Sequence, residues 1–120
     1  MKRHGITESE KRLAEIIWKN EPIHSGELVR LCEKELQWKK STTYTILKKL
    51  CEKEIFQSQD AMVTSLIKKE EFHAEQSRQF IEDTFGGSLP KFIASFIGGK
   101  KLSYQEVEEL KHLIHEYGEE

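Results

Sequence analysis

The stretch that decides the fold reads Trp38-Lys39-Lys40-Ser41-Thr42-Thr43-Tyr44-Thr45-Ile46-Leu47-Lys48-Lys49-Leu50. Ser41 is a candidate N-cap, and Thr43, Leu47 and Leu50 then recur at helical spacing, which predicts a helix over residues 41–53 with one apolar stripe. Polar and basic side chains fill the opposite stripe: Ser41, Thr42, Tyr44, Thr45, Lys48 and Lys49. Such a set contacts base edges and phosphates when a helix enters a major groove of DNA. A lysine-rich face is also typical of an ordinary solvated helix, so this pattern alone leaves both interpretations open.

Positive charge is concentrated around this helix. The chain of 120 residues has a formal net charge of −2, which argues against a protein that coats nucleic acid indiscriminately. Residues 1–58 carry 12 Lys or Arg against 9 Glu, whereas residues 59–120 carry 7 Lys or Arg against 12 Asp or Glu. The uneven distribution favours a local contact with nucleic acid in the first half of the chain.

Length and composition limit the class of protein. A chain of this length forms one domain, or two small halves that lean on each other or on a partner. No apolar run approaches the roughly 20 residues of a membrane span, and the N-terminus lacks the apolar core of a signal peptide, so we expect no membrane insertion and a cytoplasmic location. Cys32 and Cys51 have neither disulfide nor metal-site spacing, and we expect free thiols.

The residues before the basic helix predict two further helices. Thr7 and Glu10 have the spacing of a capping box, and the helix that they start ends before Pro22. Ser25 is a candidate N-cap of a second helix that reaches about Glu35. Two helices, a short turn and a basic helix follow the order of a helix-turn-helix motif, in which the second element braces the third across the DNA backbone.

A hairpin is predicted after the basic helix. Residues 55–58 and 62–67 are rich in β-forming side chains, and residues 59–61 form a tight connection between them. A hairpin in this place is the wing of a winged-helix domain, and strands this short are stable only when they pack on helices.

Three helices are predicted for the C-terminal half. The first spans residues 68–84, Ser88 caps the second, and Ser103 with Glu106 forms a capping box at the start of the third. Their one-sided apolar surfaces favour an obligate dimer interface, because so few residues cannot easily bury them alone. We expect the interface to contain Phe80, Phe85, Phe92, Phe96, Leu110 and Ile114. The alternative is that these helices fold back on the N-terminal half as one monomeric core.

The predicted fold is therefore mainly α. A winged helix-turn-helix DNA-binding domain with a short β-hairpin wing occupies residues 1–68, and a three-helix dimerisation domain occupies residues 69–120.

Four segments also match a known family in order and spacing. They are Ile6-Thr7-Glu8-Ser9-Glu10 with Trp18 downstream, Trp38 ahead of Ser41-Thr42-Thr43-Tyr44-Thr45-Ile46-Leu47 and Leu50, Phe85-Gly86-Gly87-Ser88, and Leu102-Ser103 leading to Glu108-Glu109-Leu110. Together they resemble the BlaI/MecI/CopY family, the penicillinase and methicillin-resistance repressors with their copper-responsive relatives. The resemblance covers nearly the whole chain.

This resemblance implies a homodimeric transcriptional repressor whose two recognition helices read a palindromic operator in double-stranded DNA, with a link to antibiotic resistance. It assigns base recognition to Ser41, Thr42, Tyr44, Thr45 and Lys48. It assigns phosphate anchoring to Lys39, Lys40 and Lys49. No cofactor is implied.

Three features depart from the family pattern. The wing has no basic residue and carries Asp60 at its tip, and the paired cysteines of the copper-responsive branch are absent. The bond cut by a membrane-linked sensor protease in the β-lactam-responsive branch, Asn-Phe, corresponds here to Ser95-Phe96. We expect that a cut at this bond would separate the last helix, weaken the dimer and relieve repression.

The sequence also fits other interpretations. The wing without basic residues and the modest net charge fit a dimeric modulator that pairs with another repressor and binds DNA weakly or not at all. His112, His115 and Glu116 have a spacing that a divalent ion can use, but such a pair is far more often ordinary surface, and we expect no metal. An enzyme is not expected, because the chain has neither a Gly-rich phosphate loop nor a catalytic triad.

Overall fold

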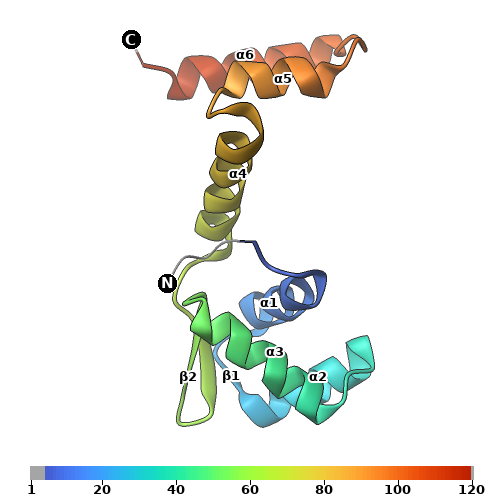
Figure 1. Cartoon of the computed structure of the whole chain (residues 1–120), viewed down its shortest axis with the longest axis vertical. Helices are drawn as coiled ribbons and strands as arrows, with labels where there is room; N and C mark the ends of the chain where they lie inside the picture. The colour runs from blue at the N-terminus through green and yellow to red at the C-terminus, as the bar shows by residue number, and fades with distance from the viewer. Residues whose placement is uncertain (1–4, 120) are drawn as a thin grey trace. The chain divides into compact units, whose positions relative to one another are not determined.

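A computed structural model describes residues 5–119 of the chain. Its elements follow the order α1 (Glu8–Asn20), β1 (Ile23–His24), α2 (Ser25–Leu36), α3 (Lys40–Glu52), β2 (Phe56–Gln59), β3 (Met62–Ser65), α4 (Lys69–Phe85), α5 (Leu89–Ile97) and α6 (Tyr104–Tyr117) (Figure 1). The predicted mainly α fold, with a winged helix followed by a helical C-terminal half, is confirmed. None of the helices in this described range is both long and apolar enough to cross a membrane.

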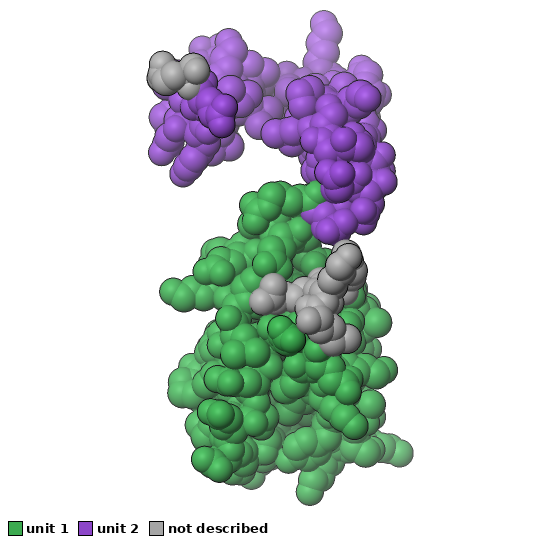
Figure 2. Space-filling view, turned by 60° about the vertical axis from the view of Figure 1, so that its left-hand side comes forward, with its two compact units in different colours: residues 1–78 green, residues 79–120 purple. Residues whose placement is uncertain are grey.

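The chain divides into two compact units, Met1–Arg78 and Gln79–Glu120 (Figure 2). The division falls inside α4, whose first turns belong to unit 1. Phe72 of α4 is buried there, and its ring lies 5.5 Å from that of Trp18 in α1. The Trp18 indole also donates a hydrogen bond to the Ile67 carbonyl at 3.1 Å. These contacts make the start of α4 part of the N-terminal unit.

The core of unit 1 lies between the three N-terminal helices and the small sheet. Apolar positions of each helix turn inward at helical spacing, and the first strand of the hairpin adds the ring of Phe56. The fully buried large side chains are Leu13, Ile17, Leu28, Leu50, Ile55, Phe56 and Val63. Figure 1 shows α3 crossing this core with α1 and α2 beside it. Helix α3 is therefore fixed on one face and free on the other.

The sheet has three antiparallel strands in the order β1-β3-β2. The predicted hairpin is confirmed, with Phe56 paired to Ser65 and Gln59 paired to Met62. The sequence did not predict β1, because two residues carry no periodic signal. His24 of β1 pairs with Met62, the first residue of β3 after the turn, so β1 holds the hairpin at its turn end. This pairing supplies the packing that so short a hairpin needs.

Three of the predicted helix caps are confirmed. The capping boxes of Thr7 with Glu10 and of Ser103 with Glu106 are both present, and the Ser88 hydroxyl accepts the Lys91 amide at 3.2 Å. Each satisfies backbone N–H groups that the first helical turn leaves without partners.

Two predicted caps are wrong. Helix α2 is capped by His24, whose Nδ1 accepts the Gly26 amide at 2.9 Å, and Ser25 is already the first helical residue. Helix α3 begins at Lys40 after the N-cap residue Lys39, so Ser41 lies inside the first turn. In both places the residue with extended backbone that caps the helix comes earlier than predicted. The cap lies one residue earlier in α2 and two residues earlier in α3.

Candidate nucleic-acid interface

The face of α3 opposite the core is solvent-exposed along its length. All eight residues predicted to contact DNA are exposed: Lys39, Lys40, Ser41, Thr42, Tyr44, Thr45, Lys48 and Lys49. The buried face of the same helix holds Thr43, Leu47 and Leu50. The structure thus brings the predicted residues together on one surface, which we call the α3 face.

The N-terminus of α3 has open backbone donors. The first intrahelical bond runs from the Thr43 amide to the Lys39 carbonyl at 3.1 Å, and no side chain caps the amides before it. Uncapped amides and the helix dipole favour an anion such as a phosphate. Lys39 and Lys40 stand at the same end with exposed side chains. This end of the α3 face is therefore suited to the DNA backbone.

Tyr44 has a partner that the sequence did not reveal. Its hydroxyl donates to the Ser25 hydroxyl at 3.3 Å, and the ring remains 38% exposed. The Ser25 amide in turn donates to the Ala61 carbonyl in the hairpin turn at 2.7 Å. Ser25 therefore connects the α3 face to the wing. No local pattern signals this contact, because the partners are 19 and 36 residues away along the chain.

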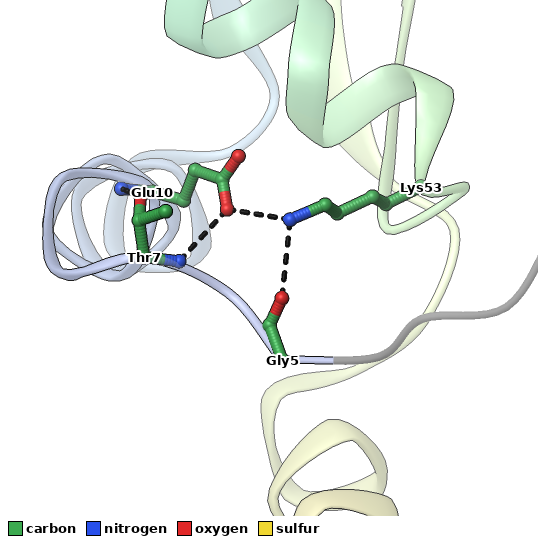
Figure 3. A network of polar contacts seen from close by, with 4 residues as sticks. All are labelled: Gly5, Thr7, Glu10 and Lys53. Atoms are coloured by element: carbon green, nitrogen blue, oxygen red, sulfur yellow. Dashed lines mark hydrogen bonds and ion pairs between the residues drawn. The ribbon is translucent and has the colours of Figure 1, made fainter.

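A polar network ties the end of α3 to the start of α1 (Figure 3). Lys53, which follows α3, donates to the Glu10 carboxylate at 2.6 Å and to the Gly5 carbonyl at 3.1 Å. The same carboxylate accepts the Thr7 amide at 2.8 Å within the capping box. The Lys53 ammonium group is thus engaged by contacts within unit 1. The exposed lysines of α3 and its N-cap are Lys39, Lys40, Lys48 and Lys49.

The pKa of Glu10 reflects this network. Burial by itself raises the pKa of the carboxyl, but the hydrogen bonds from Lys53 and Thr7 and the charges of Lys53 and Lys49 outweigh burial and lower the pKa below its ordinary value. The ionised carboxylate is therefore the form that fits the folded state.

The two cysteines are free thiols in the structure. Cys32 is buried and Cys51 is half-buried, and burial raises the pKa of both thiols. Neither is poised as a nucleophile, since the thiolate is the reactive form.

Unit 2 presents its apolar side chains outward. None of its described residues, 79–119, is buried. Phe96 is 71% exposed, Ile114 69% and Phe80 50%, while Phe85, Phe92 and Leu110 are half-buried. The rings of Phe80, Phe85 and Phe92 pack edge to face, with centroids 5.5–6.0 Å apart. All six residues predicted at a dimer interface thus keep accessible surface in the single chain.

An apolar groove of about 270 Å³ runs between α5 and α6. Its apolar lining comes from both helices: Phe92, Ile93, Phe96, Ile97, Leu102, Leu110 and Leu113. Glu106 and Glu109 complete the lining. A groove of this composition is typical of a surface that another apolar surface covers.

The remaining candidate positions also lie in unit 2. Ser95 and Phe96 are both exposed in the last turn of α5, which ends at Ile97 before the C-cap residue Gly98. His112 Nε2 lies 3.3 Å from the Glu116 carboxylate on α6. Within residues 5–119, no group of three or more His, Cys, Asp or Glu side chains is arranged to hold a metal ion.

Comparison with known proteins gives consistent matches over almost the whole chain. The family model described as "Penicillinase repressor" matches residues 6–116. The penicillinase repressor of Bacillus licheniformis is 23% identical over 116 residues, which cover 93% of this chain and 91% of that protein. The penicillinase repressor of Staphylococcus aureus is 24% identical, covering 96% and 94%. The methicillin resistance regulatory protein MecI of Staphylococcus epidermidis is 22% identical, covering 94% and 95%.

Proposed function

Because the chain belongs to the penicillinase repressor family, whose members are transcriptional repressors and not enzymes, we propose that it represses transcription as a homodimer bound to a palindromic operator. The α3 face is the observation that carries the proposal: four lysines and the hydroxyl residues between them are exposed on one element that the core holds in place. A helix so presented can enter a major groove.

The chemistry along α3 suggests a division of roles. Lys39, Lys40 and the open amides at the helix start bind phosphate, together with Lys49. Further along the helix, Thr45 and Lys48 contact base edges, with Ser41 and Thr42 at the entrance to the groove. Phosphate contacts supply most of the affinity, and base contacts supply the sequence preference.

Unit 2 joins the two copies in this proposal. Its apolar residues have no core of their own, so pairing with the same surface of a second copy removes them from water. A stable interface of the standard size buries about 800 Å² on each partner. Linking two recognition helices raises the effective concentration of the second half-site and so strengthens operator binding.

Release of the operator follows a cut between Ser95 and Phe96. Both residues are exposed, and the last turn of α5 opens more readily than a helix interior. The cut separates α6 from α5 and splits the apolar groove, which weakens the dimer. Incubation with the cognate sensor protease followed by mass spectrometry tests this step, and an uncut chain under conditions that relieve repression contradicts it.

DNA binding is tested by mobility shift with the region upstream of the chain's own gene. We expect a salt-sensitive, sequence-selective complex. Lys48→Ala and Thr45→Ala should each weaken it about tenfold. Lys11→Ala, on the exposed side of α1, is the matched control and should have less than a twofold effect.

The same experiment separates a second candidate function. A wing without basic residues fits a modulator that pairs with another repressor in place of binding DNA. No shift at low salt, with an intact dimer in sedimentation, would favour that function and contradict the first.

A further inference from the structure

The wing carries negative charge and no positive charge. Residues 54–67 contain no Lys or Arg, and their two acids are Glu54 and Asp60. Asp60 is exposed at the hairpin turn, and among residues 5–119 it has no hydrogen-bond or ion-pair partner. Its charge is therefore neutralised by no neighbouring side chain.

The turn is held rigidly. Asp60 and Ala61 both have positive φ, 51° and 64°, as in the tight two-residue turns that close antiparallel hairpins. On either side of the turn Gln59 pairs with Met62, and Met62 also pairs with His24 of β1. The hydrogen bond from the Ser25 amide to the Ala61 carbonyl adds a third attachment. The tip of the wing is thus held in place and cannot easily move away from α2.

This rigid tip lies close to the α3 face. The Tyr44 hydroxyl contacts Ser25 at 3.3 Å, and Ser25 contacts Ala61 at 2.7 Å. In Figure 1 the turn at the foot of the hairpin lies beside the start of α2, in agreement with these bonds. Ser25 contacts both Tyr44 and the turn, so the turn lies within about 10 Å of the Tyr44 hydroxyl. This is about the Debye length at 0.1 M salt, the distance over which charges in solution still interact appreciably. A duplex on the α3 face therefore feels the charge of Asp60.

We propose that Asp60 limits the affinity of the chain for DNA by repelling the phosphate backbone from the wing. The proposal rests on DNA binding through the α3 face. DNA carries one negative charge per about 1.7 Å of its axis, so an unpaired carboxylate beside the bound duplex opposes several phosphates at once. Removal of this charge should strengthen binding, in contrast to substitutions on the α3 face, which weaken it.

The repulsion is independent of base sequence, because phosphates carry no sequence information. Asp60 therefore lowers specific and non-specific binding by the same factor. The four lysines of the α3 face and its N-cap must overcome this penalty in every complex. Asp60 is in this sense an affinity-setting residue and not a base-reading one.

Fluorescence anisotropy with a 30-bp random-sequence duplex at about 50 mM salt tests the proposal, and the upstream-region duplex serves as the second probe. Asp60→Asn keeps a residue that tolerates positive φ and removes the charge. Asp60→Lys adds a charge that can contact phosphate. Glu70→Gln is the matched control, since Glu70 is also an exposed acid. It lies near the start of α4, which follows the end of β3 that is farther from the turn.

We expect Asp60→Asn to tighten binding three- to tenfold on both duplexes. Asp60→Lys should tighten it further and steepen the salt dependence by about 0.9 per subunit, as one added phosphate contact does. Glu70→Gln should change affinity less than twofold. If Asp60→Asn binds no more tightly than the unaltered chain while Lys48→Ala binds more weakly, the role of Asp60 is refuted and the proposed function stands. If neither the chain nor any variant binds either duplex, both are refuted.

Discussion

Units 1 and 2 differ in the burial of their apolar side chains. In unit 1 the rings and aliphatic chains converge on one core, and Phe56 and Leu50 are fully buried. In unit 2 the described residues 79–119 include no buried side chain, although Phe96 and Ile114 follow an equally regular helical pattern. The hydrophobic effect depends on removal of apolar area from water, so a regular pattern stabilises a fold only where a facing surface exists. Unit 1 contains its facing surface, whereas we propose that a second copy of the chain supplies the one for unit 2.

The largest expected effect is the loss of a core residue from unit 1. Phe56→Ala removes a fully buried ring that lies 5.2 Å from the Trp18 ring, and should lower the free energy of unfolding by about 3–5 kcal/mol. Both tryptophans, Trp18 and Trp38, lie in unit 1, so their fluorescence during urea unfolding reports that unit. The midpoint should not depend on protein concentration. A loss below 1 kcal/mol would show that unit 1 does not fold around this core.

A charged substitution in the apolar surface of unit 2 should weaken the dimer and leave the stability of unit 1 unchanged. Phe96→Asp puts an unpaired carboxylate where we propose that a second copy packs, and should raise the dimer dissociation constant by about 100-fold or more. Sedimentation velocity measures this change. The urea midpoint of the tryptophan signal should stay unchanged at concentrations where the variant is monomeric.

Ser95→Asp is the matched control, since it adds the same charge to the neighbouring exposed residue on a different side of α5. It should leave the dimer largely intact. A dimer that survives Phe96→Asp would refute the assignment of the unit 2 surface, and the contrast between the units would then need another cause.

A smaller effect is expected from the network that joins the end of α3 to the start of α1. Glu10→Gln keeps the shape of the side chain and removes its charge from the contact with Lys53, which should cost about 1–3 kcal/mol at pH 7. Glu8→Gln, on an exposed carboxylate of the same helix, should cost less than about 0.5 kcal/mol. Urea unfolding followed by tryptophan fluorescence compares the two variants.

The pH dependence follows from the direction of the Glu10 shift. Because the pKa is lower in the folded state than its ordinary value, the stabilisation is present at neutral pH and is lost as the pH falls through the folded value. The unaltered chain should therefore lose stability below about pH 4.5, and the Glu10→Gln variant should lose less over the same range. Parallel curves for both proteins would show that Glu10 is not the titrating group.

Local signals in the sequence predicted much of this architecture. The caps at Thr7, Ser88 and Ser103 each depend on residues within one helical turn, so spacing alone reveals them. The exposed stripe of α3 is equally local, because the period of a helix decides which residues share a face. The hairpin followed from a change of period after Glu54.

Contacts between distant segments escaped prediction. The cap by His24 and the strand β1 depend on pairing with Met62, nearly 40 residues later. The ion pair of Glu10 with Lys53 spans 43 residues, and nothing in either segment indicates it. The bond from Tyr44 to Ser25 is of the same kind, and it alters the role expected of a predicted site residue. A hydroxyl that donates within the protein does not at the same time donate to DNA.

The smallest expected effect tests that last contact. Tyr44→Phe and Ser25→Ala each remove one side of a bond that holds the α3 face against the start of α2, and each should weaken DNA binding about two- to fivefold, or about 0.5–1 kcal/mol. The double variant should bind no more weakly than either single variant, because both changes remove the same bond. Binding to random-sequence and upstream-region duplexes should fall alike, since positioning carries no sequence preference.

Thr45→Ala provides the contrast for this cycle. Thr45 is exposed on the same face and has no contact with Ser25, so its effect should add to that of Ser25→Ala and should be larger on the upstream-region duplex. If Tyr44→Phe instead weakens only the upstream-region complex while Ser25→Ala has no effect, the Tyr44 hydroxyl reads a base and leaves Ser25 when DNA binds. The connection from α3 to the wing through Ser25 would then exist only in the free protein. Unit 1, like unit 2, would in that case have a surface whose contacts are completed only by a partner, here the DNA.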